Sequence, residues 1–91
     1  MIDEVGALRD EIEKRFSDAI TELETFASGA VTLDVRSRDR VFVLAYFPSS
    51  GGFGVDELRE GEGFDSGYRF VSPDFERAAA ELYRLLTLKG R

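Results

Sequence analysis

The stretch Val41–Phe47 reads Val-Phe-Val-Leu-Ala-Tyr-Phe, and it decides the fold class because every position is apolar. A short run of this kind is typical of a strand with both faces covered, or with one face that meets another molecule. Pro48 ends the run, since proline cannot donate a hydrogen bond to a sheet. We therefore predict a central strand at residues 41–47.

The segments around this run predict a meander of short strands. Residues Val31–Arg36 alternate apolar and polar side chains, as a half-buried strand does. A polar turn follows at Ser37–Arg40, and the segments Phe53–Leu58 and Phe64–Val71 are predicted as two further strands. Because short connections favour antiparallel neighbours, we predict a four-stranded antiparallel meander sheet.

Apolar stripes at the two ends of the chain predict two amphipathic helices. The first is expected at Asp3–Ala27 with Gly29 as its stop, and the second at Pro73–Leu88 with Ser72 as its cap. Each helix has one apolar stripe, so both are expected on one face of the sheet. We therefore predict a single α+β domain over residues 1–91, in the order α-β-β-β-β-α. The stripe of the first helix comprises Val5, Leu8, Ile12, Phe16, Ile20, Leu23 and Phe26.

The turn between the first two predicted strands has an even number of residues, and this number determines which side chains of the two strands share a face of the sheet. Pairing across it places six apolar residues on one face: Val31, Leu33, Val35, Phe42, Leu44 and Tyr46. The opposite face then carries Val43 and Phe47 without a helix to cover them. An exposed apolar patch commonly marks an interaction surface, so these two residues are predicted partner contacts. A register error of one residue would exchange the two sets.

The composition argues against an enzyme. The chain has no His and no Cys, which removes the usual general base, the commonest metal ligand and the thiol nucleophile. A Ser-His-Asp nucleophile is therefore excluded. We expect no catalytic residue, no metal and no cofactor. The glycine-rich segment Ser50–Gly54 predicts a hairpin loop, because it lacks the lysine and the following helix of a phosphate-binding loop.

The net charge of −6 favours a basic protein partner. A negative field repels nucleic acid and draws basic partners inward, so we expect no direct binding to nucleic acid. The longest apolar run is too short to cross a bilayer, and the first residues have no signal-peptide character. We therefore expect no membrane association and a cytoplasmic location.

Acidic residues are concentrated after the third predicted strand. Three interpretations fit them: a solvated loop, a negative patch that faces a basic protein, and a site for a hard cation, although the spacing is not that of an EF-hand. Loops on a rigid scaffold commonly carry binding function. The predicted partner-binding residues of this acidic hairpin are Asp56, Glu57, Glu60, Glu62 and Asp65.

In outline, the chain resembles the small immunity proteins of bacterial polymorphic-toxin and interbacterial-competition systems. The similarity lies in four places: an acidic leading helix with Asp-Glu-Ile-Glu at residues 10–13, the run Val41–Tyr46, the acidic hairpin Gly52–Gly63, and Gly67–Phe70 followed by Ser72–Glu76. The resemblance implies a cytosolic protein that binds one toxin domain and blocks its active site. Acidic examples often oppose nucleases, whose substrate-binding surface is basic. Small phage-encoded inhibitors share this composition.

These observations predict an acidic inhibitor of immunity type, which neutralises a cognate toxin or effector by covering a basic active-site surface. The alternative is a structural or adaptor module that forms a homodimer through the helix-free face of the sheet. The mass in solution separates the two, because only the adaptor requires a concentration-dependent dimer.

Overall fold

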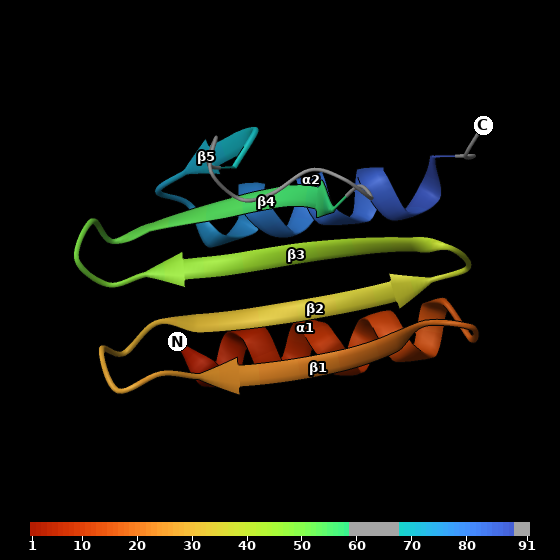
Figure 1. Cartoon of the computed structure of the whole chain (residues 1–91), viewed down its shortest axis with the longest axis horizontal. Helices are drawn as coiled ribbons and strands as arrows, with labels where there is room; N and C mark the ends of the chain where they lie inside the picture. The colour runs from red at the N-terminus through yellow and green to blue at the C-terminus, as the bar shows by residue number, and fades with distance from the viewer. Residues whose placement is uncertain (59–67, 89–91) are drawn as a thin grey trace.

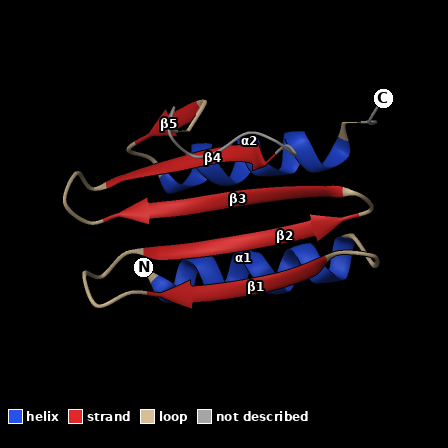
Figure 2. Cartoon of the chain, in the orientation of Figure 1, coloured by secondary structure: helices blue, strands red, loops and turns tan. Residues whose placement is uncertain are grey.

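Five strands and two helices make up the part of the chain that the computed structural model describes, residues 1–58 and 68–88. The strands form one antiparallel sheet in the order β1-β2-β3-β4-β5, so neighbours in the sequence are neighbours in the sheet (Figures 1 and 2). The α+β class and the antiparallel meander are confirmed. The elements are α1 (Ile2–Arg15), β1 (Ile20–Thr25), β2 (Val31–Ser37), β3 (Arg40–Phe47), β4 (Gly52–Leu58), β5 (Phe70–Ser72) and α2 (Phe75–Thr87).

The predicted first helix is wrong in its second half. Helix α1 ends at Arg15, and Ile20–Thr25 form strand β1, which pairs with β2 over its whole length. Ile20 and Leu23 fit a helical stripe, but Thr-Glu-Leu-Glu-Thr at residues 21–25 also follows the two-residue period of a strand. The isoleucine and the two threonines are β-branched and favour a strand. Gly29 lies in the β1–β2 hairpin with a φ of +94°, which glycine tolerates best, and does not end a helix.

This extra strand is the reason why the sheet has five strands where four were predicted. The predicted strand Phe64–Val71 lies partly outside the described residues, which contain only its last part; β5 covers Phe70–Ser72. The predicted cap of the last helix is also wrong, because Asp74 and not Ser72 is the cap. The Asp74 carboxylate accepts a hydrogen bond of 3.2 Å from the backbone N–H of Glu76, and α2 begins at Phe75.

Both helices lie on the same face of the sheet, with α1 behind β1 and β2 and α2 behind β4 (Figure 1). The predicted register of the central hairpin is confirmed: Leu33 pairs with Leu44, which pairs with Val55, and all three are fully buried under the helices. Neither helix in the described ranges is both long enough and apolar enough to cross a membrane. The fully buried helix residues of this core include Val5, Ile12, Ala78 and Leu82.

Candidate functional site

The two described acids of the predicted acidic hairpin point to opposite faces of β4. Asp56 is opposite Val43, on the helix-free face, whereas Glu57 is opposite Phe42, on the helix-covered face. Their side chains are only 13% and 14% exposed, and each is in contact with an arginine. Glu60, Glu62 and Asp65 lie outside the described residues. Asp56 and Glu57 therefore form no common surface, and their role in partner binding stays a prediction.

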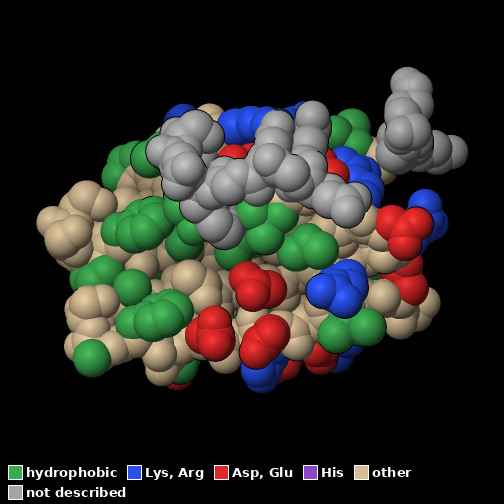
Figure 3. Space-filling view, in the orientation of Figure 1, with side chains coloured by type: hydrophobic (Ala, Val, Ile, Leu, Met, Phe, Trp, Pro, Cys, Tyr) green, Lys and Arg blue, Asp and Glu red, His purple; other side chains and the backbone are tan. Residues whose placement is uncertain are grey.

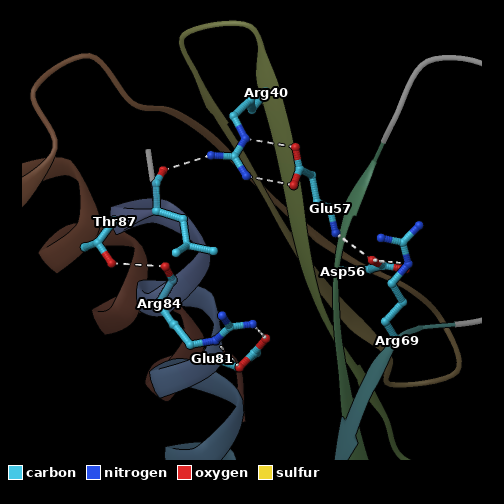
Figure 4. A network of polar contacts seen from close by, with 8 residues as sticks. Arg40, Asp56, Glu57, Arg69, Glu81, Arg84 and Thr87 are labelled. Atoms are coloured by element: carbon cyan, nitrogen blue, oxygen red, sulfur yellow. Dashed lines mark hydrogen bonds and ion pairs between the residues drawn. The ribbon is translucent and has the colours of Figure 1, made fainter. Parts of the chain in front are cut away.

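Glu57 belongs to a structural ion pair (Figure 4). The Arg40 guanidinium donates Nε and Nη2 hydrogen bonds of 2.9 and 2.8 Å to the two oxygens of Glu57, and its Nη1 donates one of 3.0 Å to the carbonyl of Leu88. These hydrogen bonds to Glu57 raise the pKa of Arg40. The contacts join β3, β4 and the end of α2. Arg40 and Glu57 therefore help to hold these three elements together.

The second predicted patch is only partly at the surface. Val43 and Phe47 lie on the helix-free face as predicted, and Phe47 is 36% exposed, but Val43 is 4% exposed. The Tyr68 ring packs on Phe47 at 5.5 Å between centroids, on the same face. Burial raises the pKa of Tyr68, and so do the nearby charges of Asp34 and Asp56. These two acids lie directly opposite Val43 in the neighbouring strands β2 and β4. Because Val43 is buried, the expectation that it is exposed is wrong.

A different group of acids lies together on the helix-free face. Glu22 of β1 is directly opposite Asp34 of β2, and Glu24 is two residues further along the same face of β1. We call Glu22, Glu24 and Asp34 the acidic triad. Figure 3 shows this face of the sheet, with acidic side chains gathered over β1 and β2. The strand register therefore brings together charges that the predicted helix would have kept apart.

The charges of the acidic triad are not neutralised within the described part of the chain. None of the three carboxylates has an ion pair or hydrogen bond with another described residue. Partial burial raises the pKa of Asp34, and the negative charges of Glu22 and Glu24 raise it further. Arg36 lies on the same face, opposite Ile20, and bonds to no acid in the part of the chain that the structure describes. The triad is therefore a concentration of negative charge that no described cation offsets.

The surroundings of the acidic triad are open and partly apolar. Ile20, on the same face and at the other end of β1, is 68% exposed, and Phe26 just after β1 is 50% exposed. Strand β1 is also the first strand of the sheet, and β2 is its only neighbour among the described strands.

Residues 1–58 and 68–88 contain no group of acidic side chains placed to hold a metal ion.

The larger hollows among the described residues lie away from the acidic triad. One, of about 580 Å³, is at the β2–β3 turn between the ends of the helices, and Phe16, Phe42 and Leu86 contribute to its walls. The other, of about 430 Å³, lies between α2 and β4, where its walls include the ion-paired side chains of Arg40 and Arg84. Neither contains a member of the acidic triad.

The acidic triad was missed because Glu22 and Glu24 were assigned to a helix. The available signal was the alternation in Thr-Glu-Leu-Glu-Thr at residues 21–25, which places both glutamates on one face of a strand.

The chain matches no family model, no curated protein and no solved structure in comparisons with known proteins.

Proposed function

We propose that this chain is an acidic inhibitor of immunity type, which acts in the cytoplasm and neutralises a cognate toxin or effector by covering a basic surface. The observation that carries the proposal is the acidic triad: Glu22, Glu24 and Asp34 share one sheet face and have no cationic partner among the described residues. The proposal moves the contact surface from the predicted acidic hairpin to β1 and β2.

The electrostatics of Asp34 support a cationic partner. Its pKa is raised because burial and two neighbouring glutamates disfavour its charged form. A lysine or arginine brought against the triad would offset this repulsion and favour ionised Asp34. The net charge of −6 adds a long-range attraction, which acts over about 8 Å at physiological salt and mainly raises the association rate.

The homodimeric adaptor receives less support from the same observation. Two copies that met through their helix-free faces would each carry a net charge of −6, and any pairing that set one β1–β2 side against the other would bring two acidic triads together. Like charges at close range are destabilising. A monomer in solution is therefore the expected state of the free chain.

The proposal is tested by co-expression with the product of a toxin-like reading frame next to its gene. We expect the chain to restore growth and to bind that product. The double variant Glu22→Lys with Glu24→Lys should slow association by about tenfold at low salt, and the difference should shrink as salt is raised. Both substitutions relieve repulsion at Asp34, so weaker binding would not come from a less stable fold.

The matched control is Asp3→Lys with Asp10→Lys, which changes the net charge equally. Both residues are exposed on α1, away from the helix-free face. This control should retain most of the association rate. Equal association rates for the two double variants would assign the effect to net charge and remove the triad from the interface. Failure of the wild-type chain to bind or to restore growth would overturn the inhibitor proposal.

A further inference from the structure

Strand β1 has an open edge whose main-chain groups are available for pairing. Phe26 N–H donates a hydrogen bond of 2.9 Å to the carbonyl of Ala30, which makes these two residues a hydrogen-bonded pair at the end of the β1–β2 hairpin. Along an antiparallel ladder, hydrogen-bonded pairs alternate with pairs that share no hydrogen bond. The next hydrogen-bonded pairs along β1 are therefore Glu24 with Thr32 and Glu22 with Asp34.

It follows that the other residues of β1 direct their N–H and C=O groups away from the sheet. These are Thr21, Leu23 and Thr25, and no described residue bonds to their outward main-chain groups. Figure 1 shows no described segment beside this edge of β1. At the opposite edge of the sheet, β5 has only three residues. Edge β1 is therefore the longer template for an added strand.

The side chains of β1 define which strand would fit. Residues opposite Glu22 and Glu24 would form pairs without hydrogen bonds, where opposing Cα atoms approach to about 4.5 Å. Lysine or arginine fits there, because opposite charges across two strands attract and the triad has no other cation among the described residues. The residue between them would lie opposite Leu23, which packs against the core, so an apolar residue fits.

A second copy of this chain fits the same edge poorly. A two-fold pairing of complete β1 strands would centre on Leu23 and place Glu22 of each copy opposite Glu24 of the other. Like charges directly opposite each other are destabilising. Charges on an edge strand commonly prevent self-association. The two glutamates therefore select against a second copy and for a basic strand.

We infer that an extended strand of a protein partner, with the pattern basic-apolar-basic, adds to the free edge of β1 and sets its two basic side chains against the acidic triad. This inference rests on the proposed function, since it specifies how the basic partner is held. Main-chain hydrogen bonds to Thr21, Leu23 and Thr25 would provide affinity, and Glu22, Glu24 and Asp34 would provide specificity.

The test uses the full chain and a capped synthetic peptide that alternates lysine and valine. On binding, amide hydrogen exchange of Thr21, Leu23 and Thr25 should slow by about tenfold, since these groups become hydrogen-bonded. The amides of Glu22 and Glu24 already face β2 and should change little. The variant Glu22→Lys with Glu24→Lys should lose the effect, and Asp3→Lys with Asp10→Lys should keep it.

Two modified peptides separate strand addition from simple charge attraction. Methylation of the main-chain nitrogens of the valines removes the N–H donors that face β1 and should abolish the amide protection. Methylation of the main-chain nitrogens of the lysines alters only the outer edge of the added strand and should preserve the protection. Equal binding of both peptides, without amide protection, would overturn strand addition and leave the inhibitor proposal standing. Failure of the unmodified peptide to bind would also overturn strand addition. Protection that rises with protein concentration in the absence of peptide would instead make a second copy the occupant.

Discussion

The ring of Tyr68 lies against Gly54 so closely that a methyl group on Gly54 would come within 2.6 Å of the Tyr68 Cγ atom. Gly54 is in the middle of β4, opposite Ala45, and the absence of a side chain there gives Tyr68 its place on the helix-free face. This contact, together with the pairing of Tyr68 and Phe47, explains why the face is less open than alternation along β3 predicts.

The first prediction concerns this contact. Gly54→Ala should lower the free energy of unfolding by about 1–3 kcal/mol, because the new methyl group displaces Tyr68 or the strand. Urea denaturation measures the loss. Gly6→Ala is the control: its methyl group would have only an ordinary contact of 4.0 Å with Leu23, so it should stabilise α1 by about 0.5–1 kcal/mol. A Gly54→Ala variant as stable as the wild type would show that Tyr68 does not rest on β4.

The second prediction separates buried from exposed placement on β3. Val43→Glu should lower the free energy of unfolding by more than about 3 kcal/mol, because Val43 is 4% exposed and lies directly opposite Asp34 and Asp56, so the variant buries a carboxylate beside two acids. Phe47→Glu should cost much less, since Phe47 is 36% exposed and loses mainly its contact with Tyr68. Thermal unfolding of both variants tests this order. A Val43→Glu variant as stable as Phe47→Glu would return Val43 to the surface.

The third prediction concerns the ion pair between Arg40 and Glu57. Arg40→Met should destabilise the chain by about 1.5–3 kcal/mol, because it removes two charge-assisted hydrogen bonds at a part-buried site and the bond to the Leu88 carbonyl. Arg38→Met is the matched control, since Arg38 is 81% exposed and lies 3.7 Å from Asp18. It should change stability by at most about 0.5 kcal/mol. Similar losses in both variants would count against a structural role for the Arg40 pair.

The fourth prediction concerns the pH dependence caused by Asp34. The pKa of Asp34 is raised in the folded state, so the folded chain binds this proton more tightly than the unfolded chain. Stability from this group is therefore lost as pH rises above the ordinary aspartate value of 3.8 and through the higher folded value. Asp34→Asn should then be more stable than the wild type at pH 7.

The advantage of Asp34→Asn should disappear below the ordinary aspartate pKa, where Asp34 is protonated in both states. Unfolding in urea across the acidic range measures this difference directly. Asp39→Asn, in the exposed β2–β3 turn, should show a much smaller effect at pH 7. An Asp34→Asn variant that is less stable at pH 7 would mean that the Asp34 charge is compensated in the folded chain.

The local sequence is sufficient to predict those elements whose apolar residues recur with only one of the two periods, that of a helix or that of a strand. Residues 41–47 are too short and too uniformly apolar for an amphipathic helix, and residues 31–36 alternate strictly, so β2 and β3 and their register follow from the residues themselves. The C-terminal helix was predicted for the same reason, because its apolar residues recur only at helical spacing.

Tertiary structure decided the segments and contacts that local pattern leaves open. Residues 20–25 fit a helical stripe as well as a strand, and pairing with β2 selects the strand. That choice places Glu22 opposite Asp34, and it creates both the acidic triad and the free edge. Likewise, Tyr68 meets Gly54 and Arg40 meets Glu57 only after the strands have paired. Local composition determines which residues prefer a strand or a helix, but long-range pairing determines which charges become neighbours.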